Sequence, residues 1–208
     1  NGSAMVYARP GDSRRERWPL DRLRTEEAFG HGGDLVARLV HEPAIAFVAG
    51  EAGNGDGLRI LASAPDGTEQ SADLRRNGGT IHYRPVTGDP LQLGGERDLA
   101  DRDWLAATWD GAYPDAPVQL LSLFDSHRTG DLLVVAREGY DFRDKFEIPE
   151  HKAGHGSFFK AHMQTPLWAN RPVPDGAVRT VDVFPAMLAW LGVEAPAGID
   201  GEGVWEVS

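Results

Sequence analysis

Apolar residues occur along this chain in short runs, and the spacing of these runs predicts both strands and helices. Residues 44–50 (AIAFVAG) and 57–65 (GLRILASAP) flank a loop of Gly, Asn and Asp, which is typical of two antiparallel strands. Residues 80–86 (TIHYRPV) follow the turn sequence NGG and extend this pair into an antiparallel meander. Residues 5–9 (MVYAR) and 165–170 (TPLWAN) are shorter strand candidates.

The clearest strand signal lies in residues 130–140 (GDLLVVAREGY). Five consecutive apolar residues, Leu132 to Ala136, contain no polar position that would face water. A run of this kind is typical of an interior strand that is covered on both faces. We therefore expect it to be the central strand of the sheet.

Three segments before this strand and one near the end of the chain have helical features. Residues 32–42 carry apolar residues at 35, 36, 39 and 40 and end before Pro43. Residues 98–109 and 116–124 are the next two predicted helices. The last predicted helix is 181–192, with Asp182 as N-cap, Pro185 in the first turn and Gly192 at the end.

These elements predict one α/β domain over residues 6–208, because no internal repeat or low-complexity linker divides the chain. Residues 1–5 (NGSAM) lack the charged and apolar regions of a signal peptide, and we expect them to be a cloning remnant. A targeting signal would then lie outside this sequence, which leaves the compartment open.

Charge and composition exclude several kinds of partner and chemistry. The net charge is −11 and the pI is near 5.0, which argues against nucleic acid as a partner. The sequence contains no cysteine, and this excludes disulfides, cysteine-ligated zinc and thiol nucleophiles. No apolar run approaches the roughly 18–20 residues needed to cross a bilayer, so we expect no membrane association.

Three of the seven histidines fall close together around the sequence EHKAGHGSFF, residues 150–159. His151 and His155 are four residues apart, which is a spacing found in helical zinc sites. Glycines at 154 and 156 and Pro149 argue against a helix here. From composition alone these residues are either solvated loop histidines, which is the simpler interpretation, or metal ligands, and His162 follows as a third candidate.

Carboxylates also surround the predicted strand at 130–140. Asp125, Asp131, Asp141 and Asp144 could bind metal ions or transfer protons, although solubility at strand edges and in loops is the simpler interpretation. His127 in the same region is expected to be exposed. The sequence contains no G-x-S-x-G motif, no P-loop and no G-x-G-x-x-G motif before a helix.

The order of motifs from Ser126 onward resembles the C-terminal region of the alkaline phosphatase superfamily, in particular type I phosphodiesterases and nucleotide pyrophosphatases. The matching features are the strand SHRTGDLLVVAREGYDF, the loop AGHGSFF, and the helix within RTVDVFPAMLAWLGV followed by GIDG. The resemblance implies the C-terminal part of an alkaline-phosphatase-like sandwich: a mixed sheet with flanking helices and an antiparallel meander.

The resemblance also implies a function. In that family two divalent metal ions, usually zinc, flank the phosphorus of a small-molecule phosphate ester, and a Thr or Ser nucleophile attacks it. The histidine of the His-Gly-Ser loop is a metal ligand, which here corresponds to His155. The family's other ligands and its nucleophile come from earlier in the chain, and this sequence lacks those motifs. Glu27 and His31 have the spacing of a ligand pair but not the family's Asp.

We therefore expect a C-terminal fragment of a metal-dependent phosphoesterase that contributes His155, has no catalytic residue of its own and is inactive alone. The fragment should bind no metal ion stably, since catalytic zinc needs about three protein ligands. Strand edges left exposed in such a fragment would favour self-association. The alternatives are a non-catalytic binding module with the same fold, or a sulfatase or phosphomonoesterase of the same superfamily.

Overall fold

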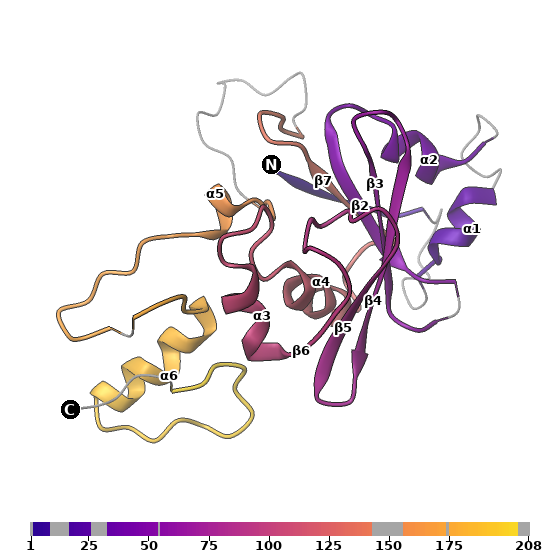
Figure 1. Ribbon diagram of the computed structural model, residues 1–208. Helices are drawn as coiled ribbons and strands as arrows, with labels where there is room; N and C mark the ends of the chain where they lie inside the picture. Colours follow the sequence, from indigo (N-terminus) through magenta and orange to yellow (C-terminus); the bar gives the residue numbers. More distant parts are fainter. Residues whose placement is uncertain are drawn as a thin grey trace, which may run out of the picture.

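The computed structural model describes residues 2–8, 17–25, 33–53, 55–142, 156–173 and 175–203, and its central feature is one twisted sheet (Figure 1). Within these residues the sheet has seven strands. They are β1 (Ser3–Val6), β2 (Ile45–Glu51), β3 (Leu58–Ser63), β4 (Glu69–Asn77), β5 (Thr80–Thr87), β6 (Arg97–Ala100) and β7 (Leu132–Ala136).

The strand order is β1-β7-β2-β3-β4-β5-β6, and every neighbouring pair is antiparallel. The predicted antiparallel meander is confirmed, and it runs from β2 to β6, although the prediction included only β2, β3 and β5. The prediction of a mixed sheet is wrong, because β7 runs antiparallel to both β1 and β2. An apolar run indicates that both faces of a strand are covered, but it does not indicate whether the strand is parallel or antiparallel to its neighbours.

Helices flank both faces of the sheet, as predicted for an α/β fold. In Figure 1, α1 and α2 lie on one side of the sheet and α3 and α4 lie on the other, whereas α6 lies farther away. Among the described residues, no helix is long and apolar enough to cross a bilayer. The helices are α1 (Leu20–Thr25), α2 (Leu35–Val40), α3 (Asp101–Thr108), α4 (Ala116–Asp125), α5 (Lys160–Met163) and α6 (Thr180–Trp190).

Each face of the sheet has its own hydrophobic core. Alternate residues of β7 divide between them: Leu133 and Val135 face the larger core with α3 and α4, and Leu132 and Val134 face the smaller core with α1 and α2. Fully burying a side chain of this size contributes about 1.5–3 kcal/mol. Strand β7 is thus an interior strand, although it is second from the sheet edge rather than at its centre.

Strand β4 is absent from the predictions, because its sequence EQSADLRRN is mostly polar. Its buried side chains are Ala72 and Leu74. On its other face Asp73 pairs with Arg59 of β3 at 2.8 Å and with Arg84 of β5 at 2.8 Å. Burial acts to raise the pKa of Asp73, but the two arginines outweigh it and lower the pKa below its usual value. Cross-strand charge pairing therefore supports a strand that hydrophobicity does not reveal.

Several predicted boundaries move in the structure. The strand expected at 5–9 is β1 at Ser3–Val6, so it includes three residues of the expected cloning remnant. The first residues of the helix expected at 98–109 form β6 instead, and α3 begins at Asp101. The strand expected at 165–170 is wrong, because the described chain there pairs with no strand.

Helix α6 matches the predicted helix in extent but not in how it begins. Its N-cap is Arg179, and Asp182 is the third residue, whose carboxylate accepts the backbone N–H of Arg179 at 3.2 Å. Pro185 lies inside the helix rather than in its first turn. The end is as predicted: Gly192 has φ +69°, and the N–H groups of Gly192 and Val193 donate to Ala189 and Leu188 in a Schellman motif.

Asp131, a candidate carboxylate at the start of β7, is buried and has a structural role. One carboxylate oxygen accepts the backbone N–H of Ala8 at 2.7 Å and the other accepts that of Trp18 at 2.7 Å. These two bonds connect the chain on both sides of residues 9–16 to β7. Both acceptor oxygens of Asp131 are thus occupied by backbone N–H groups.

We expect Asp131→Asn to lower the free energy of unfolding by about 2 kcal/mol. The asparagine replaces one acceptor oxygen by an NH₂ donor, so one of the two backbone N–H groups loses its acceptor. Urea unfolding monitored by circular dichroism measures this loss. The control is Asp125→Asn, since Asp125 is exposed and forms an ion pair with the exposed side chain of Arg76; its expected effect is below about 1 kcal/mol. Equal losses in the two variants would contradict the assignment.

Candidate functional site

The predicted metal ligand, His155, lies outside the described residues, as do His151, Glu27, His31 and Asp144. The described chain resumes at Gly156, directly after His155. The candidate site is therefore built from Gly156 to Phe159 and from the elements against which these four residues pack.

Gly156 to Phe159 lie against the amino end of β1, beside the carboxyl end of β7. A Cβ atom placed on Gly2 would be 2.5 Å from the Cβ of Ser157, so only glycine at position 2 allows this approach. Ser157 is buried, and its hydroxyl accepts the N–H of Phe159 at 3.3 Å. Gly156 has φ +72°, a conformation that glycine adopts without strain. The backbone after His155 is thus held tightly.

Two aromatic side chains anchor this segment in the larger core. The ring of Phe158 packs edge-on against Phe47 of β2, with 5.7 Å between ring centroids. The ring of Phe159 lies 5.5 Å from that of Tyr113, and burial raises the pKa of the Tyr113 hydroxyl. His162 is exposed and contacts Phe159 edge-on at 6.4 Å. The loop residues after His155 therefore belong to the rigid part of the fold.

A small cavity of about 40 Å³ lies beside this segment, lined by Arg137, Tyr140, Ser157 and His162 among others. This volume suits ordered water rather than a substrate. The guanidinium of Arg137 donates to the carbonyls of Pro43 and Ile45, at 3.1 and 3.2 Å. Within the described chain, no group of three or more His, Cys, Asp or Glu residues is arranged to hold a metal ion.

The candidate carboxylates do not converge with this segment. Asp125 and Asp131 lie before β7, at the opposite end of the strand, and both have the partners described above. Asp141 is exposed. His127 is exposed, as predicted. The structure thus supports the solubility and structural interpretation for the described carboxylates.

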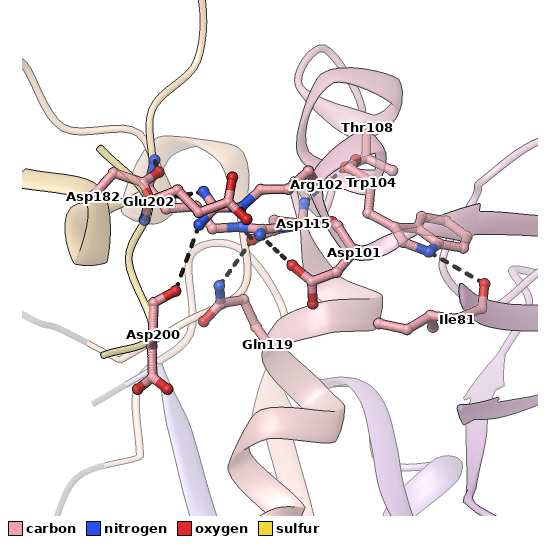
Figure 2. A network of polar contacts seen from close by, with 11 residues as sticks. Ile81, Asp101, Arg102, Trp104, Thr108, Asp115, Gln119, Asp182, Asp200 and Glu202 are labelled. Atoms are coloured by element: carbon pink, nitrogen blue, oxygen red, sulfur yellow. Dashed lines mark hydrogen bonds and ion pairs between the residues drawn. The ribbon is translucent and has the colours of Figure 1, made fainter. Parts of the chain in front are cut away.

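A second polar site, which the sequence did not predict, lies where α3, α4 and α6 meet (Figure 2). The guanidinium of Arg179 donates to both carboxylate oxygens of Asp115, each at 2.8 Å, and also to Asp101. Arg179 and Asp115 are almost fully buried. Burial acts to lower the pKa of Arg179, but Asp115 and Asp101 outweigh it and raise the pKa.

The same network continues to the first turn of α6 and to the chain that follows it. Arg102 donates to Asp182 at 2.6 Å and contacts Glu202 at 3.3 Å, as Figure 2 shows. The backbone N–H of Glu202 donates to Asp182 at 3.0 Å. We refer to Asp101, Arg102, Asp115, Arg179, Asp182 and Glu202 as the arginine–aspartate network.

The network positions α6 and is not itself an anion site. Both guanidinium groups are already paired with carboxylates of the protein, and four carboxylates face two arginines. A phosphate would therefore meet excess negative charge. The sequence motif RTVD contains Arg179, but nothing in the sequence indicates that Asp101 and Asp115 are the partners of this arginine, because those contacts span 64 to 78 residues.

Two further motif residues meet at the start of α6. Pro185 has no N–H, so the carbonyl of Val181 lacks its usual helical donor. Gly201 of the GIDG sequence lies against that carbonyl: a Cβ on Gly201 would be 2.0 Å from the Val181 oxygen and 3.1 Å from Pro185 Cδ. Any side chain at position 201 would displace the loop. The proline and the glycine are thus coupled by one close backbone approach.

Comparisons with protein-family models, curated proteins and solved structures gave no match for this chain. The resemblance to the alkaline phosphatase superfamily therefore depends on the sequence motifs alone.

We expect Arg179→Met to destabilise the protein by about 3 kcal/mol or more, because it leaves Asp115 buried without its cation. Hydrogen exchange should also accelerate in α6, which the network holds against α3 and α4. Urea unfolding and exchange mass spectrometry measure the two effects.

The matched control is Arg75→Met, since Arg75 pairs with Asp56 where both side chains are about half exposed. Its expected cost is below about 1 kcal/mol. If Arg179→Met leaves both stability and exchange in α6 unchanged, the network does not position this helix.

Proposed function

We propose that this chain is the C-terminal part of a metal-dependent phosphoesterase, similar to phosphodiesterases and nucleotide pyrophosphatases, to which it contributes the metal ligand His155. The observation that carries the proposal is the fixed position of Gly156 to Phe159 at the carboxyl end of β7. Ligand and catalytic residues are commonly found next to segments that are packed into the fold.

The packing of Gly156 to Phe159 supports the proposal. Ser157 and Phe158, which follow His155 by two and three positions, are buried. Gly156, which follows His155 directly, has a positive φ that glycine adopts without strain. A metal ligand needs such support, since coordination tolerates only small displacements of the ligating atom.

In the proposed parent enzyme, two divalent metal ions, usually zinc, would supply Lewis acid chemistry toward a small-molecule phosphate ester. The role of this chain in that chemistry would be to provide and orient the imidazole of His155. The remaining ligands and the nucleophile would come from preceding residues. The proposal therefore requires an upstream reading frame that encodes an Asp, a Thr or Ser nucleophile and a D-x-x-x-H pair.

A non-catalytic interaction module is the second candidate function. The observation that favours it is an apolar surface around α6, where Trp168 is 88% exposed and Leu191 is 73% exposed. Surfaces of this kind mark interaction sites. Within the enzyme proposal, a sulfatase or phosphomonoesterase is the alternative, and a panel of sulfate, phosphate monoester and phosphodiester substrates distinguishes these activities.

We expect the 208-residue chain to show no hydrolysis of bis(p-nitrophenyl) phosphate above the blank when zinc is added, because one imidazole does not make a catalytic zinc site. Release of p-nitrophenol measures the rate. Turnover that His155→Ala removes would contradict the prediction of an inactive fragment.

The enzyme proposal itself is tested on the longer chain encoded with the upstream residues. His155→Ala should lower its phosphodiester hydrolysis by about 100-fold or more and reduce its bound zinc, measured by elemental analysis. The control His162→Ala removes a nearby exposed imidazole and should retain both activity and metal. If the longer chain binds no zinc and hydrolyses no phosphate ester, the enzyme proposal fails and the interaction module remains.

A further inference from the structure

Helix α6 and the chain on either side of it expose most of the large apolar side chains that face solvent in the described residues. Eight of the eleven large apolar residues that are exposed in the described chain lie between residues 167 and 193. They are Leu167, Trp168, Val173, Val181, Phe184, Met187, Leu191 and Val193.

The helix is apolar around most of its circumference, but one side of it, with Val181, Phe184 and Met187, is exposed. Its buried residues are Asp182, Pro185 and Ala186, which face the body of the molecule. A helix that is apolar on all sides is normally buried on all sides. The uncovered faces of α6 therefore call for a partner that this single chain does not supply.

The extended chain before α6 forms a groove against the helix. The groove has a volume of about 430 Å³ and lies between Leu167 to Arg171 on one wall and Val183, Met187, Trp190 and Leu191 on the other. Trp168 is one of the residues of the first wall, and it is 88% exposed. The surface thus combines an apolar groove with an exposed aromatic residue on its wall, so two copies of the surface can pack against each other.

We propose that this groove is the dimer interface of the chain, with Trp168 of each copy inserted into the groove of the other around a two-fold axis. A two-fold interface uses the same surface on both copies, so each copy contributes both its groove and its exposed Trp168 to the contact.

The available area supports a second copy as the occupant. An aromatic side chain presents about 150–250 Å², so the exposed parts of Trp168 and Phe184 alone present on the order of 300 Å². The six other exposed residues extend this surface toward the roughly 800 Å² per partner that specific interfaces bury. Exposed apolar surfaces on monomers are generally smaller than this.

Charge also favours this surface over others for self-association. Two copies that each carry a net charge of −11 repel one another, so contact is least costly where charge is absent. The only charged residue of α6 is Asp182, which is buried and paired with Arg102. Among the described residues that line the groove, only Arg171 is charged, so the groove adds no negative charge to the contact.

The sheet edges are weaker candidates for the contact. The edge strands β1 and β6 have four residues each, so each offers few backbone groups for pairing. Strand β6 also carries the charged residues Arg97 and Asp98, and charges on short edge strands oppose edge-to-edge pairing.

Light scattering after size-exclusion chromatography, over a concentration series of the 208-residue chain, tests the proposal. The wild-type chain should be a dimer. Trp168→Ser and Leu191→Glu, on opposite walls of the groove, should each weaken the dimer about 100-fold or more, because each substitution occurs twice in a two-fold interface. Circular dichroism and thermal unfolding confirm that both variants fold.

The control variant is Tyr140→Ser, which removes an exposed aromatic side chain outside the groove and should leave the dimer intact. Because the chain has no cysteine, single-cysteine variants add a geometric test. A mixture of Leu167→Cys and Leu191→Cys should form intermolecular disulfides faster than Val86→Cys, which lies on β5.

Two results would overturn the proposal. If the wild-type chain stays monomeric at every concentration tested, the groove does not bind a second copy and is available to another partner, such as a preceding segment of a longer chain. A dimer that both groove variants leave unchanged places self-association elsewhere, for example on a strand edge. Neither result bears on His155, so this inference and the phosphoesterase proposal fail separately.

Discussion

Burial of β7 on both faces is the constraint on which the rest of this fold depends. Five consecutive apolar residues cannot face water on either side, so the sheet must carry a helical layer on each face around this strand. Helices α1 and α2 supply one layer and α3 and α4 the other. Both edges of β7 are also paired, by β1 and β2. The last strand in sequence thus joins the first strand to the meander.

The two ends of β7 then organise different parts of the molecule. At its start, the carboxylate of Asp131 ties Ala8 and Trp18 to the strand. At its other end, Ser157 and Phe158 pack beside β1 and against Phe47. Residues 156–159, which follow the proposed metal ligand His155 in sequence, are therefore packed against the first strand and the larger core.

Charged contacts and one close backbone approach hold the start of helix α6 against the rest of the molecule. The arginine–aspartate network joins it to α3 and α4, and Gly201 fits against the carbonyl that Pro185 leaves free. This arrangement fixes the helix through its first turn and leaves its apolar sides uncovered. A helix attached in this way presents a preformed surface to a partner, which lowers the ordering cost of association.

The sequence by itself determined the elements with strong local signals. The apolar runs of β2, β3 and β7, the Gly-rich turns and the Schellman end of α6 at Gly192 all depend on residues within a few positions of one another. It did not reveal β4, because that strand is stabilised by cross-strand pairs of Asp73 with Arg59 and Arg84.

Only the tertiary structure decided the direction of β7, the separation of Asp131 from Gly156 to Phe159, and the partners of Arg179. Each of these is a long-range contact, and the physical reason is the same in every case. A local pattern specifies whether a residue is buried, but the residue that it meets depends on how distant segments are brought together.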